Sequence, residues 1–118
     1  NPFVSLDPIL NVYPIREMVM DLPQAVVAVS PIVGGQAVKG PAAKMMQERG
    51  VAVSATAVRD YYGDLLDGFV YDVQDAAAEP PAGMTLCVDT MMHDDADRRR
   101  LAQDVLALAQ RIIVATAE

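Results

Sequence analysis

Several residue types are scarce in this chain, and each scarcity narrows what the protein can do. Its 118 residues contain no tryptophan, one cysteine and one histidine, and 9 lysines and arginines face 16 aspartates and glutamates. Because Cys87 is the single cysteine, a disulfide framework is excluded and a reducing, cytoplasmic compartment is expected. The net charge of −7 argues against nucleic acid or an anionic membrane as a general partner. No apolar run approaches the roughly 18 residues that span a bilayer.

The remaining composition is that of a folded domain. Hydrophobic residues make up 53% of the chain, so a core is expected and disorder is not. The length allows one domain or one part of a larger domain. Because the chain starts abruptly at Asn1 and Pro2, as if within a loop, we expect a piece of a longer protein.

Apolar runs alternate with helical patterns along the chain. Strands are predicted at residues 25–30, 69–71 and 84–88, and helices at 15–20, 41–49, 55–62 and from 94 or 95 onward, with a helical turn within 72–78 and an irregular loop over 1–14. Alternating strands and helices favour parallel pairing. The predicted fold is α/β, part of a doubly wound, Rossmann-like parallel sheet with flanking helices, and its ligand crevice is expected at the carboxyl ends of the strands.

The segment after the first predicted strand has the features of a phosphate-binding loop. Ser30 ends the strand, Gly34 and Gly35 follow, and Lys39 and Gly40 precede a new helix. Glycines let the backbone approach an anion, free N–H groups point outward, and a helix N-terminus favours negative charge. The spacing does not match a Walker motif. A loop whose two glycines simply turn the chain is the alternative.

Polar and aromatic residues at two other places are candidate ligand contacts. Asp89 and Thr90 directly follow the third predicted strand, where α/β proteins hold ligands; alternatively, they cap the following turn. Tyr61 and Asp64 are predicted beside the crevice, where a ring-shaped ligand would meet them.

Other groups that could carry chemistry have simpler structural explanations. A lone histidine before a helix is most simply a solvated loop residue, and carboxylates in a first helical turn complement the helix dipole rather than bind a metal. Paired methionines are expected in the core, and consecutive arginines on a solvated helix face. These residues are His93, the carboxylates at 94, 95 and 97, the methionines at 45–46 and 91–92, and the arginines at 98–100.

Several of these segments, taken together, resemble the family of 2-phospho-L-lactate transferases, the CofD-like enzymes. They occur in the order and spacing of the family over nearly the whole chain. The segments are Asn1-Pro2-Phe3-Val4-Ser5, residues 8–10, Val29-Ser30-Pro31-Ile32-Val33-Gly34-Gly35, Lys39-Gly40-Pro41-Ala42, Tyr62-Gly63-Asp64-Leu65-Leu66-Asp67-Gly68-Phe69-Val70 and Asp89-Thr90-Met91-Met92.

The resemblance implies an activity and its partners. It implies the C-terminal part of an enzyme of coenzyme F-420 biosynthesis, whose N-terminal part is absent here. Such enzymes transfer a phospholactyl or related phospho-acid group from a guanosine diphosphate conjugate to the deazaflavin Fo, release GMP and require Mg²⁺. On this basis the nucleotide and its phosphates are assigned to Asn1, Pro2, Ser30, Gly34, Gly35, Lys39 and Gly40, and the acceptor to Tyr61, Asp64, Asp89 and Thr90. The catalytic residues are not identified, and the metal ligands are expected mainly in the absent part.

Two other interpretations stay open. A non-catalytic regulatory protein of the same superfamily would bind a nucleotide sugar, and it would not need the aromatic pocket that a deazaflavin requires. A purely structural half-domain would use the glycine loop only to turn. Whether the donor carries lactate, enolpyruvate or glycerate is not decided by the residues present. A homodimer also stays open, because a thin three-stranded sheet leaves apolar surface uncovered.

Overall fold

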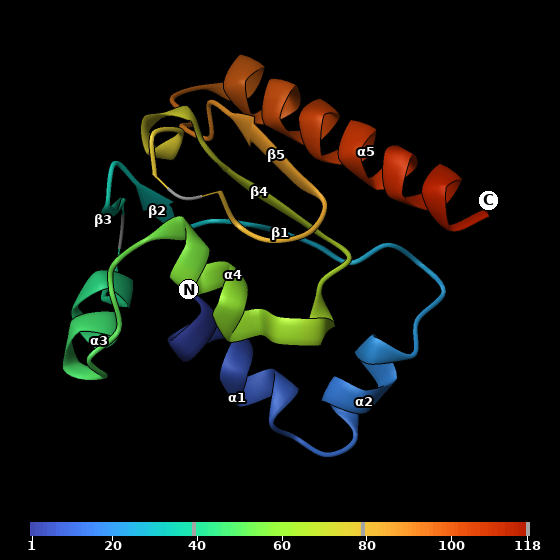
Figure 1. Cartoon of the computed structure of the whole chain (residues 1–118), viewed down its shortest axis with the longest axis horizontal. Coiled ribbons are helices and arrows are strands. Elements are labelled where there is room, and N and C mark those ends of the chain that lie inside the picture. The colour runs from blue at the N-terminus through green and yellow to red at the C-terminus, as the bar shows by residue number, and fades with distance from the viewer. Residues whose placement is uncertain (39, 79, 118) are drawn as a thin grey trace.

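A computed structural model describes residues 1–38, 40–78 and 80–117, and three parallel strands lie at its centre (Figure 1). These strands are β1 (Val27–Val29), β4 (Gly68–Asp72) and β5 (Thr85–Val88), in the spatial order β1-β4-β5. Every residue of β4 is buried, as expected for the central strand of a parallel sheet covered on both faces. The predicted α/β fold with a parallel sheet and flanking helices is confirmed.

Helical segments precede the strands and separate them. In chain order they are η1 (Pro2–Leu6), α1 (Asp7–Leu10), α2 (Ile15–Met20), α3 (Ala42–Glu48), α4 (Ala55–Tyr62), η2 (Gly63–Leu65), η3 (Val73–Asp75) and α5 (Asp95–Ala117). The helices predicted at 15–20, 41–49, 55–62 and from 95 are therefore present, and η3 is the predicted helical turn. Ser54 caps α4 by accepting a hydrogen bond from the Ala57 N–H at 3.0 Å. None of the helices in the described ranges is long and apolar enough to cross a bilayer.

The sheet separates two apolar layers, because successive side chains of a strand point to opposite faces. On one face, Val70 packs with the apolar stripe of α5, which consists of Leu101, Leu108 and Ile112. On the other face, Phe69 and Tyr71 join a core that includes α4 and the N-terminal helices. Figure 1 shows α5 along one side of the sheet and α4 and α1 on the other. These α5 residues recur at helical spacing and so lie on one face of the helix, which is the face that is buried.

α5 approaches the sheet closely at Gly68. A Cβ atom at this position would lie 2.6 Å from Cδ1 of Ile112 and 3.2 Å from Cδ2 of Leu108. Real Cβ atoms do not make contacts of 2.6 Å, so the helix can sit at this depth only because residue 68 has no side chain.

Two expectations about local structure were wrong. Residues 2–10 form the helical turns η1 and α1 rather than an irregular loop. Asn1 starts the first of them, because its Oδ1 accepts hydrogen bonds from the N–H groups of Phe3 (2.8 Å) and Val4 (3.3 Å), and Pro2 occupies the first turn, where no N–H is needed.

The second wrong expectation concerns the glycine loop. Its flanking residues pair as an antiparallel hairpin of β2 (Ile32–Val33) and β3 (Gln36–Ala37). Gly34 and Gly35 form the two-residue turn with φ of 60° and 74°. Two consecutive positive φ values are what such a hairpin turn requires, and glycine adopts them without steric cost.

Candidate functional site

A cavity of about 550 Å³ opens where the parallel strands end. Ser30 follows β1 and Thr90 follows β5, and both line this cavity, so the structure brings these two predicted site residues together at the predicted edge. The lining is mostly apolar. It consists of Val29, Ser30, Pro31, Val33, Val38, Thr90, Met91, Met92, His93 and Leu101.

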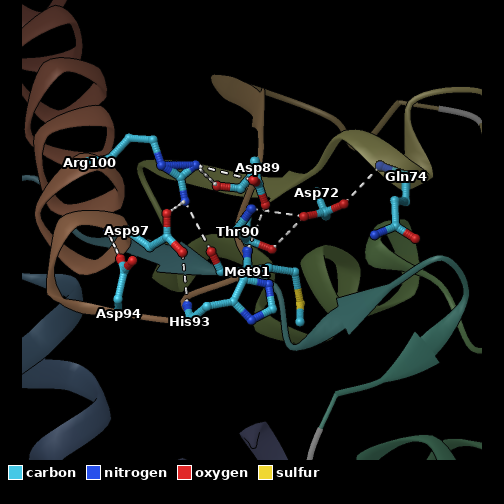
Figure 2. A network of polar contacts seen from close by, with 9 residues as sticks. All are labelled: Asp72, Gln74, Asp89, Thr90, Met91, His93, Asp94, Asp97 and Arg100. Atoms are coloured by element: carbon cyan, nitrogen blue, oxygen red, sulfur yellow. Dashed lines mark hydrogen bonds and ion pairs between the residues drawn. The ribbon is translucent and has the colours of Figure 1, made fainter.

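Asp72, the last residue of the central strand, is the hub of the polar network at this edge (Figure 2). Its Oδ2 accepts hydrogen bonds from the Thr90 N–H (2.8 Å) and the Thr90 hydroxyl (2.9 Å), and its Oδ1 accepts one from the Gln74 N–H (2.8 Å). Asp72 is completely buried. Burial by itself raises the pKa of a carboxyl group, but these hydrogen bonds outweigh burial and hold the pKa of Asp72 below its usual value. Asp72 is therefore a buried carboxylate anion.

This network fixes the chemistry of the Asp89–Thr90 pair. The Thr90 hydroxyl donates its hydrogen bond to Asp72. Only the lone pairs of the hydroxyl oxygen therefore remain, and they can accept a hydrogen bond from a ligand. Asp89 is exposed, and its Oδ1 accepts a hydrogen bond from the Met91 N–H at 2.9 Å. The turn-capping interpretation of this pair is thus present in the structure at Asp89, while Thr90 lines the cavity.

Arg100 holds the same segment from the other side. Its guanidinium donates hydrogen bonds to the main-chain oxygens of Asp89 (3.1 Å) and Met91 (3.0 Å), and it forms ion pairs with the carboxylates of Asp89 and Asp97. Residues 98 and 99 lie on the solvated helix face, as expected. The expectation was wrong for Arg100, which is half-buried and donates to a main-chain oxygen. The reason is that the first turns of α5 pass directly beside the end of β5, as Figure 2 shows.

The residues at the start of α5 have the structural roles expected of them. Asp94 Oδ1 accepts a hydrogen bond from the Asp97 N–H, and Asp97 Oδ2 accepts one from the His93 N–H, each at 2.9 Å. His93 is exposed and lines the cavity. Across residues 1–38, 40–78 and 80–117, no three His, Cys, Asp or Glu side chains come together as a set that could hold a metal ion.

The paired methionines do not behave alike. Met46 is buried in the core, as predicted. Met92 is 51% exposed and lines the cavity together with Met91, so the core prediction was wrong for this pair. The physical reason is that Met91 and Met92 follow the end of β5, where the chain leaves the interior.

The glycine hairpin forms a small anion site, which is filled from within the chain. The N–H groups of Gly34 and Gly35 donate hydrogen bonds to Oδ2 (3.1 Å) and Oδ1 (2.9 Å) of Asp75, in η3. These are the N–H groups that the sequence assigned to phosphate. Gly40 is exposed before α3, with φ of 76°. The assignment of Lys39 lies outside the described residues.

A second cavity, of about 340 Å³, adjoins the first and shares Val29 and Pro31 with it. Asn1, Pro2 and Tyr62 also line it. The Nδ2 of Asn1 is buried there without a hydrogen-bond partner among the described residues. Asn1 and Pro2 therefore lie next to the strand end that carries Ser30.

Tyr61 and Asp64 are placed elsewhere. The Tyr61 hydroxyl donates a hydrogen bond to the Asp7 carboxylate, and its ring centroid lies 4.7 Å from that of Phe3, within the helical layer. Asp64 is exposed in η2. Neither residue lines the two cavities at the carboxyl edge. Tyr62 does line the second cavity, and burial, followed by the negative charge of Asp7, raises its pKa to about 12.

Sequence reasoning missed Asp72, Asp75 and Arg100 as contributors to this region. Asp72 was detectable, because it directly follows a predicted strand, which is the same signal that singled out Asp89 and Thr90. Asp75 and Arg100 act through contacts between segments far apart in the sequence, and nothing in their local pattern indicates them.

Comparison with known proteins identifies relatives of the chain, although no protein-family model matches it. It is 39% identical over 112 residues to the 2-phospho-L-lactate transferase of Methanosarcina acetivorans, and the aligned region covers 92% of this chain and 36% of the relative. It is 40% identical over 108 residues to the enzyme of the same name from Methanocaldococcus jannaschii (90% of this chain, 34% of the relative). Over 117 residues it is 41% identical to the phosphoenolpyruvate transferase of Streptomyces coelicolor (95% and 37%). The chain is therefore homologous to one part of these transferases, and it spans about a third of the length of the curated relatives that it matches.

Proposed function

We propose that this chain is part of a transferase of coenzyme F-420 biosynthesis. The reaction moves a phospholactyl or related phospho-acid group from a guanosine diphosphate conjugate to the deazaflavin Fo and releases GMP. The observation that carries the proposal is the sequence identity of 35–41% to 2-phospho-L-lactate and phosphoenolpyruvate transferases over 90–96% of the chain. The two names differ in the acid, so the donor acid is left to experiment.

The chemistry suits a site built for positioning. A hydroxyl oxygen of Fo attacks the phosphorus atom that carries the acid, a new P–O bond forms, and the bond to the departing GMP breaks. Such a transfer depends mainly on alignment of the reactants and on neutralisation of the phosphate charge. We assign the phosphates to Ser30, Lys39 and Gly40, and the nucleotide also to Asn1 and Pro2. Gly34 and Gly35 stay in the proposal as the residues that shape this loop, because their N–H groups already donate to Asp75.

The acceptor is assigned to the cavity of about 550 Å³. Its apolar lining suits the face of the flat deazaflavin ring, and the Thr90 hydroxyl oxygen can accept a hydrogen bond from a ring N–H. Thr90 is thus retained as a contact of the deazaflavin, whereas Asp89 precedes it in the chain but lies outside the lining, and its assignment stays a prediction. Tyr61 and Asp64 lie outside this lining, and their assignment stays a prediction that a ligand complex would test.

Magnesium is part of the proposal, and its ligands are expected mainly outside this chain. The described ranges hold no set of three suitable ligands, and an acidic protein binding a diphosphate needs counter-charge. We therefore propose that most ligands of the ion come from the two thirds of the relatives' length that this chain does not span.

One observation favours a second candidate, a nucleotide-sugar-binding regulatory protein. A deazaflavin pocket is expected to use aromatic side chains, and the described lining of the larger cavity includes no Phe or Tyr. A regulator would not need them.

A titration of the intact protein distinguishes these functions. GDP, UDP and ADP, each with magnesium, are compared by the shift in thermal unfolding, because a bound ligand stabilises the folded state. Preference for GDP, followed by GMP release when Fo and the phospholactyl conjugate are added, is the expected result. Preference for UDP without turnover would favour the regulator. A folded protein that binds none of the three nucleotides would contradict both functions, with circular dichroism as the control for folding.

A further inference from the structure

One short segment, residues 72–75, connects the two walls of the larger cavity. Asp72 contacts the wall that follows β5, and Asp75 contacts the hairpin that follows β1. The segment itself starts at the end of β4, between these two strands. Neither carboxylate lines the cavity, so each can affect a ligand there only through the wall that it holds.

Asp72 holds the wall that contains Thr90. Its carboxylate accepts hydrogen bonds from both the N–H and the hydroxyl of Thr90. It also accepts one from the N–H of Gln74, in its own segment. A buried carboxylate loses the solvation of water, so these donors are needed to keep it ionised. The conformation of the Thr90 wall, which continues through Met91 and Met92, is therefore tied to the end of β4.

Asp75 holds the opposite wall. The hairpin has strands of only two residues each, so its own ladder provides little rigidity. Its base is anchored by the buried Ile32, whereas its tip is held by the two hydrogen bonds from Gly34 and Gly35 to Asp75. Val33, beside the tip, lines the cavity.

We propose that Asp72 and Asp75 are positioning residues, which together set the separation of the two cavity walls. Because both carboxylates belong to the same short segment, a shift of that segment moves both walls. Loss of either carboxylate removes the hydrogen bonds that hold one wall in place. The link to turnover rests on the proposed function. The link to cavity shape does not, so the two can be tested separately.

The test uses the intact protein with labelled valine and methionine methyl groups. Asp75 is only half-buried, so Asp75→Asn is not expected to prevent folding. It replaces one of the two carboxylate oxygens by an NH₂ group, which cannot accept a hydrogen bond. The rate of amide hydrogen exchange at Gly34 or Gly35 is therefore expected to rise roughly tenfold, the equivalent of one lost hydrogen bond to a charged group. The methyl signals of Val33 are expected to shift. Asp75→Glu, which restores the charge, is expected to recover part of both effects.

The Asp72 half is tested in the same way. Asp72→Asn is expected to shift the methyl signals of Met91 and Met92. Because Asp72 is buried and its substitution can prevent folding, Thr90→Val serves as the second variant; it removes one donor to Asp72 and is expected to shift the same signals. Thr90→Ser keeps the hydroxyl and is expected to leave them in place. Asp60→Asn, which changes an exposed carboxylate of α4, is the matched control for both halves.

The kinetic readout separates positioning from a merely structural role. In an active wild type, Asp75→Asn is expected to lower kcat roughly tenfold with a smaller change in KM, because misplaced reactants bind but react slowly. Methyl shifts without any kinetic change would overturn the positioning role, as would methyl signals that do not move.

Tighter binding of inorganic phosphate or GDP to Asp75→Asn would also overturn the proposal, because Asp75 would then be a competitor at the hairpin rather than a support. An inactive wild type would count against the proposed function alone, since the methyl signals would still decide whether the walls are held.

Discussion

Replacement of Thr90 by valine removes one hydrogen bond from the buried Asp72 carboxylate and leaves the shape of the side chain almost unchanged. Asp72 would keep the two N–H donors of residues 90 and 74, both at 2.8 Å, and lose the hydroxyl donor at 2.9 Å. A hydrogen bond to a charged group contributes about 1.5–3 kcal/mol. Against a total of about 5–15 kcal/mol for a typical domain, that loss is easily measured.

The pH dependence of this loss identifies its cause. The pKa of Asp72 is lowered in the folded protein, so the unfolded chain binds the proton more readily and stability falls as the pH drops below the usual value of 3.8. Thr90→Val raises the folded pKa toward that value. The difference between wild type and variant is therefore expected to be full at neutral pH and to shrink as the pH falls through the folded pKa of Asp72.

Urea unfolding at several pH values measures this difference, with an unchanged dependence on urea as the sign that only stability has changed. Thr85→Val is the matched control. Thr85 is half-buried in β5, its hydroxyl makes no hydrogen bond within the described residues, and valine suits a strand, so a change below about 0.5 kcal/mol is expected. A stability loss in Thr90→Val that stays constant from pH 7 down through the acid unfolding range, or no loss at all, would refute the account of Asp72 as an anion held by Thr90.

Three further predictions concern the packing and the protonation of the fold. Gly68→Ala is expected to lose about 1–3 kcal/mol through overpacking against Ile112, and Ile112→Val, which removes the clashing Cδ1, should recover part of that loss in a double-mutant cycle; strict additivity would contradict it. Gly34→Ala is expected to cost about 1–2 kcal/mol in urea unfolding, because φ is positive and the new Cβ lies 3.2 Å from Oε1 of Gln74, whereas an unchanged midpoint would rule out the hairpin turn. Tyr62 ionises near pH 12 in the folded protein, so its contribution to stability is present below pH 10 and is lost toward pH 12; Tyr62→Phe should flatten that alkaline loss, and an identical alkaline profile in the variant would disprove it.

The parts of the fold with regular patterns were predictable from the sequence. The stripe of Leu101, Leu108 and Ile112 defined a helix and its buried face, and Ser54 marked a helix start, because both signals lie within one element. The N-terminal turns were missed because prolines were interpreted as loop formers, although Pro2 fits the first turn of a helix that Asn1 caps.

The candidate site was predictable only where its residues follow strands. Ser30 and Thr90 were found because parallel strands end at the same edge. The glycine pair was singled out as an anion loop, but its pattern suits a hairpin turn equally well, and in the structure the N–H groups of the hairpin turn donate to Asp75. Such a contact joins positions 40 residues apart, and no local pattern encodes it.

The register of the sheet also sets the order in which the strands come together during folding. Phe69 of β4 pairs with Thr85 of β5, whereas Val27 of β1 pairs with Gly68 of β4, so the second pairing closes a loop more than twice as long. Each doubling of a loop adds about 0.6 kcal/mol to the entropy cost of closing it. The pair of β4 and β5 is therefore expected to form first, with β1 joining it last. Because β1 leads to Ser30, the cavity has only one of its two walls until this final step of assembly.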